Sequence, residues 1–239
     1  MNSLIYDEEQ VSKFLNLMKF GLLPSEPLKF YFQIHARKKH GSPVETILAR
    51  KLIDINLVHN DLVYEVNKLT PFCGFMYIDD NKKIEIKHEY ISVYITTEPR
   101  NFIKSTSDLS CEFMTFITER HKSHKQDFDV ISKYYSYLQK NPETKRFLDI
   151  DIDIKELLNT VVLMLKELNI RPIMIIETRS GFHILLYKLF LNDHMNKIIY
   201  ERTKELKNID LLSNAMVPVP GSFQGSFKVR LIDVNSLFD

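Results

Sequence analysis

The stretch FLDIDID, from Phe147 to Asp153, carries the strongest structural signal in this chain. Acidic and apolar residues alternate with a period of two, which is typical of a β-strand whose successive side chains point to opposite faces. Asp149, Asp151 and Asp153 are therefore expected on one face, and the residues between them in a core. Same-face Cα atoms on a strand lie about 6.5–7 Å apart, so the carboxylates can converge on one or two divalent ions. The alternative is a solvated sheet face, although aspartate is depleted in strands and three of them need a reason.

The segments after this strand alternate between helical and strand patterns. In order, the sequence predicts a helix over 155–168, a strand over 171–177, a tight turn at TRSG, a strand over 182–187, a helix from Asp193 to about 206, a loop at VPVPGSFQG and a strand over 227–233. The order β-α-β-β-α-β is that of ferredoxin-like folds and RNA-recognition modules. We therefore predict an α+β protein with a ferredoxin-like catalytic core. Because this fold hosts many functions, the function has to come from the site.

The N-terminal region shows no motif of this strength. The spacing of apolar residues predicts helices over 7–20 and 45–57, a strand over 29–35 and a hairpin over 76–86. The basic run Arg37, Lys38 and Lys39 is expected in a loop, either as solvated surface or as a contact to nucleic acid. We assign residues 1–90 to an N-terminal α/β accessory region and residues 91–239 to a catalytic domain, which opens with a strand at ISVYIT and a helix over 102–119.

Composition narrows the class of protein. The chain has 239 residues, of which 44% are hydrophobic, enough for a substantial core, and its formal net charge is +1. The two cysteines, Cys73 and Cys111, are too few and too far apart for a zinc ribbon, so no zinc is expected. No secretory signal and no run of about 18 apolar residues is visible, which predicts an intracellular protein without a membrane span.

Several motifs together resemble the archaeo-eukaryotic primase superfamily, which includes primase-polymerases and the polymerase domains of bacterial end-joining ligases. LDID at 148–151 is similar to the first motif of that family, a hydrophobic run with D-x-D/E, and TRSGFH at 178–183 to the second, a small residue shortly before a histidine. Ile209-Asp210 is the best match to the third, an apolar residue followed by an acidic one. VYITTEPRNF and PGSFQGSFKV resemble two further family segments, and the resemblance covers about 91–233.

The resemblance implies a DNA or RNA primase or primase-polymerase that adds nucleotides to a strand by two-metal phosphoryl transfer. Asp149, Asp151 and Asp210 would hold two Mg²⁺ or Mn²⁺ ions, with Asp233 as an alternative third ligand. The triphosphate would be bound by Ser180, the Gly181 amide and His183, and by the cationic side chains Lys228 or Arg230 and Arg179. The implied partners are nucleoside triphosphates, a single-stranded or primed template and a replication protein such as a helicase or a large subunit.

The chain also departs from the family. Glu98-Pro99-Arg100 stands where the family usually has N-P-R, and no zinc module, helicase or ligase domain is recognisable. Three other readings therefore stay open: a metal-dependent nuclease, a non-catalytic nucleic-acid-binding module, and an inactive accessory subunit of a replication complex. Binding modules of this fold usually present stacking aromatic residues on the sheet. The first strand here presents carboxylates, which argues against binding alone.

Overall fold

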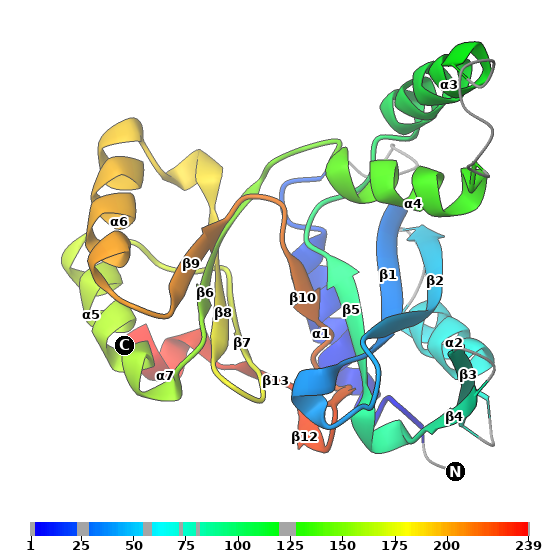
Figure 1. Ribbon diagram of the computed structural model, residues 1–239. Helices are drawn as coiled ribbons and strands as arrows, with labels where there is room; N and C mark the ends of the chain where they lie inside the picture. Colours follow the sequence, from blue (N-terminus) through cyan, green and yellow to red (C-terminus); the bar gives the residue numbers. More distant parts are fainter. Residues whose placement is uncertain are drawn as a thin grey trace.

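The fold was analysed in a computed structural model that describes residues 3–22, 29–54, 59–71, 74–79, 82–119 and 128–238. Figure 1 shows two large antiparallel β-sheets and a separate two-stranded hairpin, with helices around them. The helices are α1 (Glu8–Met18), α2 (His59–Leu69), α3 (Phe102–Glu119), α4 (Val130–Lys140), α5 (Leu158–Glu167), α6 (Asp193–Glu205) and α7 (Val234–Phe238). The strands are β1 (Lys29–Ala36), β2 (Thr46–Asp54), β3 (Phe75–Asp79), β4 (Lys82–Ile86), β5 (Ile91–Thr96), β6 (Phe147–Ile152), β7 (Met174–Glu177), β8 (Phe182–Tyr187), β9 (Ile209–Leu212), β10 (Met216–Pro218), β11 (Phe223–Gln224), β12 (Phe227–Lys228) and β13 (Arg230–Ile232).

The second sheet contains the acidic strand. Its strand order is β13-β7-β8-β6-β9, and all of its described pairings are antiparallel. Helices α5 and α6 cover one face (Figure 1), where Ile150, Ile152, Ile184 and Leu186 pack in a core that the helices complete. Alternation along β6 therefore places its aspartates on the opposite face, as the sequence predicted. The prediction of an α+β fold is confirmed at this level.

The first sheet has the order β12-β11-β5-β1-β2, with β10 also paired to β5. Its apolar side forms a core with α1, and this core also includes Ile176 and Leu185 from the second sheet. The two sheets are thus joined by shared apolar packing. Because β5 and β10–β12 lie on the C-terminal side of residue 90, the first sheet crosses the predicted boundary between the accessory region and the catalytic domain.

Two predicted elements are wrong. Residues 46–54 form the edge strand β2, paired along its length with β1, although its Leu, Ala, Arg and Lys favour a helix; tertiary pairing overrides that preference. The predicted strand over 227–233 is divided between the sheets, since β12 pairs with β11 and β13 with β7. The strand that follows α6 is β9, which the sequence analysis did not predict.

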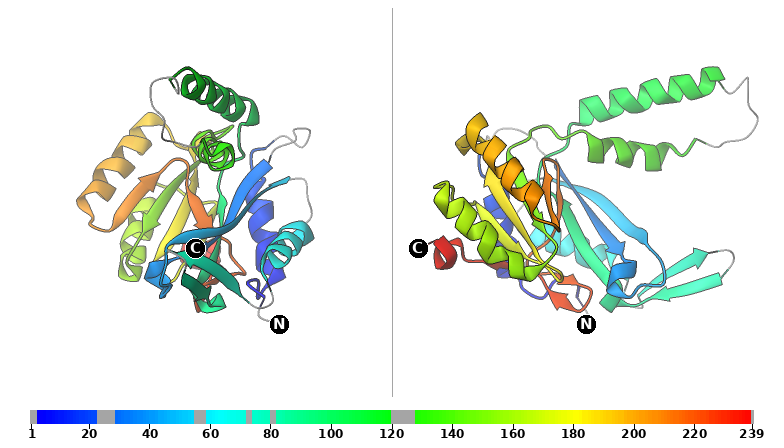
Figure 2. Two further views of the ribbon diagram at one scale, coloured as in Figure 1. Left: turned by 45° about the vertical axis from the view of Figure 1, so that its right-hand side comes forward. Right: turned by 60° about the vertical axis from the view of Figure 1, so that its left-hand side comes forward.

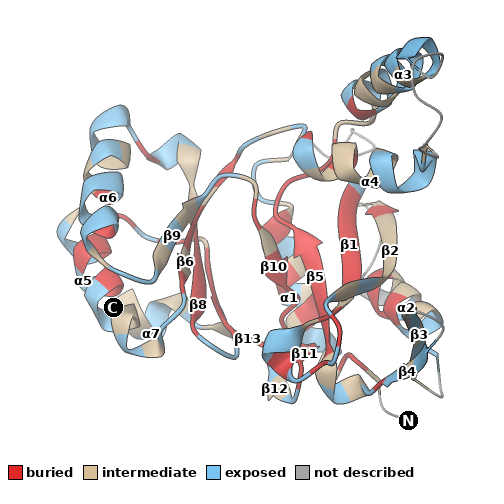
Figure 3. Cartoon of the chain, viewed as in Figure 1, coloured by how far each residue is buried: buried red, intermediate tan, exposed pale blue. Residues whose placement is uncertain are grey.

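The link between β5 and β6 is a pair of helices. Figure 2 shows that α3 and α4 extend from the body as an arm, with α3 on its outer side, and Figure 3 shows that α3 is largely exposed. At the base of the arm, the Arg100 guanidinium donates to the carbonyl oxygen of Gln139 at 2.9 Å, near the end of α4. None of the helices in the described ranges is long and apolar enough to cross a membrane.

Candidate active site

The register of the second sheet brings the predicted acidic residues together. Asp151 on β6 lies directly opposite His183 on β8 and, on its other side, directly opposite Asp210 on β9. Cross-strand partners share a face, so these three side chains and Asp149, two residues earlier on β6, all project from the face away from α5 and α6. Asp210 is exposed and Asp149 is only 1% exposed. Three segments far apart in the chain thus form one acidic face.

His183 joins the two carboxylates of β6. Its Nδ1 lies 2.9 Å from Asp149 Oδ2 and 3.5 Å from Asp151 Oδ1. The histidine is buried, while the Asp151 side chain is 29% exposed. The second oxygen of Asp149, Oδ1, is also buried and has no hydrogen-bond partner among the described residues. An unpartnered buried carboxylate oxygen is costly, and this one lies on the same face as Asp151 and Asp210.

The electrostatics of the acidic face follow from burial and proximity. Burial raises the pKa of Asp151 above its usual value, and Asp149 and Asp153 add to the rise, against the opposing charges of His183 and Lys39. Burial by itself would lower the pKa of His183, but the Asp149 and Asp151 carboxylates outweigh it, and the pKa is raised. The two carboxylates therefore stabilise the protonated imidazole relative to its neutral form.

The hairpin turn between β7 and β8 carries three predicted triphosphate ligands. A Cβ on Gly181 would lie 1.6 Å from the Ile152 carbonyl oxygen, so only glycine lets this turn approach the end of β6. The Gly181 amide donates to Thr178 Oγ1 at 3.0 Å, so it is already engaged within the turn. Arg179 and Ser180 are exposed. The Arg179 amide donates to Gln224 Oε1 at 2.7 Å, which ties the turn to the first sheet.

A group of cationic side chains lies next to this turn. Lys39, in the short helical turn after β1, is close enough to act electrostatically on both Asp151 and His183. Burial, together with Lys39, Arg179 and Arg37, lowers the pKa of His40 to about 4. From the sequence, Lys39 is expected either as solvated surface or as a contact to nucleic acid. Its basic run directly after a strand was the available signal, but the sequence does not indicate that this loop faces the acidic strand.

The structure separates the remaining predicted residues from the acidic face. Arg230 on β13 lies opposite Glu177, on the helix-covered face of the second sheet, and Glu177 accepts hydrogen bonds from Arg230 Nε at 2.7 Å and Lys155 Nζ at 2.6 Å. Lys228 belongs to the first sheet, with its Nζ 5.1 Å from the centre of the Tyr6 ring. Asp233 accepts the amide of Asn235 at 3.0 Å at the start of α7. Of the two alternatives for a third ligand, only Asp210 lies beside Asp151.

The carboxylates fit magnesium or manganese in chemical type, since both ions prefer oxygen ligands. Within the described residues, no group of three or more His, Cys, Asp or Glu side chains is arranged to hold a metal ion as it stands. His183 occupies the position between Asp149 and Asp151, so ion binding would require these side chains to turn toward the ion. The unpartnered Asp149 Oδ1 is the observation that supports such a site.

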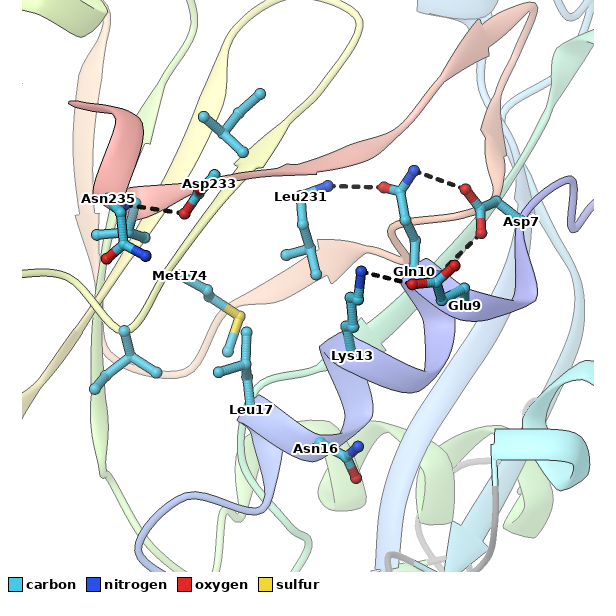
Figure 4. A pocket seen from close by; sticks show the side chains of 13 residues that line it. Asp7, Glu9, Gln10, Lys13, Asn16, Leu17, Met174, Leu231, Asp233 and Asn235 are labelled. Carbon is cyan, nitrogen blue, oxygen red and sulfur yellow. Dashed lines mark hydrogen bonds and ion pairs between the residues drawn. The ribbon is translucent and has the colours of Figure 1, made fainter.

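A separate pocket of about 820 Å³ lies between α1 and β13 (Figure 4). Its polar side chains are bonded to one another: Gln10 donates to Asp7 at 3.0 Å and accepts the Leu231 amide at 3.0 Å, and Lys13 pairs with Glu9 at 2.7 Å. No residue that lines this pocket has one of the buried, unpartnered side-chain atoms found in the described part of the chain.

Comparisons of this chain with protein-family models, with curated protein sequences and with solved structures give no significant match. Functional inference therefore rests on the motifs and on the geometry of the acidic face.

Proposed function

We propose that this protein is a metal-dependent nucleotidyltransferase, a primase or primase-polymerase that extends a nucleic-acid strand on a template from nucleoside triphosphates. The observation that carries the proposal is the cross-strand row of Asp210, Asp151 and His183, with Asp149 beside it. These residues come from the three motifs that resemble the archaeo-eukaryotic primases. Their arrangement on one face is what that chemistry requires.

The fold supports the same proposal. Strands β6, β7, β8 and β9 with α5 and α6 follow the order β-α-β-β-α-β, and the first of these strands is central, between β8 and β9. We propose that this unit is a ferredoxin-like catalytic core. Strand β13 adds to its edge from the C-terminal end of the chain.

Each residue of the acidic face has a proposed role. Asp149, Asp151 and Asp210 would hold Mg²⁺ or Mn²⁺ and orient the reacting groups. When bound, the ions would lower the pKa of the primer 3′-hydroxyl and stabilise the in-line displacement at the α-phosphate. His183 keeps Nδ1 on Asp149, which leaves Nε2 as the ring nitrogen for a phosphate oxygen.

The triphosphate needs positive charge, which the acidic face by itself lacks. Lys39 and Arg179, exposed on two neighbouring loops, would supply it, with the Ser180 hydroxyl as a hydrogen-bond donor. Lys228 and Arg230 are less suited, because Arg230 is bound to Glu177 and Lys228 lies on the first sheet. The proposed partners remain a single-stranded or primed template and a helicase or large subunit.

The test uses the purified full chain with Mg²⁺ or Mn²⁺, labelled nucleotides and primed and unprimed single-stranded templates side by side. We expect metal-dependent synthesis that Asp151→Asn reduces by roughly 1,000-fold, equivalent to about 4 kcal/mol of activation free energy. Asp233→Asn is the matched control, because this carboxylate lies between β13 and α7, away from the acidic face, and the variant should retain activity. Lys39→Ala should raise KM for the nucleotide more than it lowers kcat.

The other outcomes would overturn the proposal in distinct ways. Shortening of the template without synthesis would indicate a nuclease. No reaction with either metal, on either template, would indicate an accessory subunit. Equal activity of the Asp151→Asn and Asp233→Asn variants would show that the acidic face does not carry the chemistry.

A further inference from the structure

Helix α3 makes its contacts to α4 with one side only. On that side Asp108 accepts from Asn141 Nδ2 at 2.8 Å, Glu112 accepts from the Tyr137 hydroxyl at 2.8 Å, and the rings of Phe116 and Phe128 are 5.1 Å apart. Figures 1 and 2 show the opposite side of α3 turned away from the body. Of its 18 residues only Ser105 is buried. The two acidic residues in the middle of α3, Asp108 and Glu112, thus make these hydrogen bonds on the side that faces α4.

The outer side of α3 has the pattern of a helix-packing seam. Ile103, Ser107, Ser110, Met114 and Ile117 follow one another at spacings of four, three, four and three residues, the repeat of a coiled coil. Ile103 is 86% exposed and Met114 is 59% exposed. Every exposed residue from Thr106 to Thr118 is uncharged. A helix surface this apolar and uncharged is unusual for a solvated face.

Three hydroxyl groups of α3 donate hydrogen bonds within the helix. Ser110 donates to the Thr106 carbonyl oxygen at 2.8 Å, Thr115 to that of Cys111 at 3.0 Å, and Thr118 to that of Met114 at 3.1 Å. Because their donors are satisfied inside the helix, these residues can contact an apolar partner without losing a hydrogen bond. Serine is also small enough to let a second helix approach closely.

We infer that α3 is a dimerisation element on which α3 of a second copy of this chain packs in the antiparallel direction, through the side of each helix that faces away from its own α4. The seam is complementary to itself when reversed. Ile117 then lies against Ser107 of the partner subunit and Met114 against Ser110 of the partner subunit, a large side chain on a small one in each layer. The same holds in the opposite direction, as a twofold interface requires.

Charge supports a second copy over a nucleic acid. The seam and its flanks carry no cation between Thr106 and Thr118 to meet phosphates. Between Thr106 and Thr118, pairing two identical uncharged surfaces brings no like charges together. In this register Cys111 lies near the twofold axis, opposite Cys111 of the partner subunit, and α3 offers a contact about 27 Å long. A single helix pair is a small interface, so we expect a dissociation constant in the micromolar range.

The test is analytical ultracentrifugation of the full chain over a range of concentrations that spans the micromolar scale. We expect a reversible monomer–dimer equilibrium that Met114→Glu weakens by roughly 100-fold or more, because two unpaired carboxylates would be buried. Met76→Glu on β3 is the matched control, since Met76 is equally 59% exposed but lies outside the arm, and it should leave the equilibrium unchanged. Equal melting temperatures of the two variants would show that both are folded.

Cross-linking is an independent test of the antiparallel register proposed for the two α3 helices. In a Cys73→Ser variant, a short thiol-specific bifunctional reagent should join two chains through Cys111, and Met114→Glu should abolish the product. A monomer at every concentration, or a dimer that survives Met114→Glu, would overturn the inference. These results do not depend on catalytic activity, so they stand apart from the proposed function.

Discussion

Two buried carboxylates, Glu98 and Asp149, differ in how well their surroundings satisfy them. Glu98 accepts the Phe147 amide at 2.8 Å with one oxygen, and the Thr144 hydroxyl at 2.8 Å and Arg146 Nε at 3.0 Å with the other. Asp149 has one bond, to His183, and an oxygen without a partner among the described residues. Both are almost completely buried.

Glu98 thus has a structural role, whereas Asp149 keeps one oxygen without a partner among the described residues. Arg146 also donates to the Met18, Phe20 and Thr97 carbonyl oxygens, so the Glu98 network joins α1, the end of β5 and the start of β6. The three groups that donate hydrogen bonds to Glu98 therefore stabilise the fold. At Asp149, three residues after Arg146, a buried carboxylate oxygen has no partner among the described residues, which costs stability.

The largest stability effect is expected from breaking the Glu98 network. Glu98→Ala leaves the charge of the buried Arg146 without its carboxylate partner. Loss of one partner of such a buried pair costs about 3–5 kcal/mol in the free energy of unfolding. Urea denaturation followed by circular dichroism measures the change. Glu143→Ala, an exposed glutamate on the same link, is the control and should change it by less than about 0.5 kcal/mol. Similar losses for both variants would show that the Glu98 network contributes no more to stability than an exposed glutamate does.

A divalent cation should stabilise the acidic face and not the Glu98 network. At an ion concentration of 100 times the dissociation constant, Mn²⁺ should add about 2.7 kcal/mol to the free energy of unfolding. Thermal unfolding with and without the ion, followed by its removal with a chelator, measures the effect. The gain should disappear in Asp149→Asn and persist in Asp233→Asn. An equal gain in stability in both variants would show that the ion binds at another site.

Without a metal ion, Asp151→Asn should raise the melting temperature at neutral pH. The folded-state pKa of Asp151 is raised, chiefly by burial, so its ionised form is destabilising at any pH above that pKa. The amide removes the charge and keeps the shape. Scanning calorimetry at pH 7 in the presence of a chelator tests this, and a lower melting temperature than wild type would show that the His183 contact outweighs the cost of burial.

The smallest expected effect is the pH dependence that His183 contributes. Its folded-state pKa is raised above the unfolded value of about 6.5, so its charged contacts stabilise fully below that value and are lost as the pH rises through the folded-state pKa. The stability difference between wild type and His183→Asn should therefore be larger at pH 6 than at pH 9. A difference that does not change with pH would indicate that the imidazole is neutral throughout.

Local pattern was enough to predict most of the second sheet and part of the acidic face. The alternation in FLDIDID predicts β6 and the common face of its aspartates, and the helical period predicts α5, because both patterns reflect burial of one side of a regular element. The TRSGFH turn was predicted between two strands, as observed. The register of β6 and β8 places His183 on the same face as these carboxylates.

Tertiary structure alone decided the rest. Residues 46–54 form a strand because they pair with β1, and helix propensity does not reflect such a contact between separate segments. Arg230 was separated from the acidic face because β13 pairs it with Glu177, on the helix-covered side of the second sheet. Lys39 was brought toward Asp151 by the packing of one sheet against the other. Sequence periodicity reports which side of an element is buried, whereas the meeting of distant loops depends on how the sheets pack, and no local pattern records that packing.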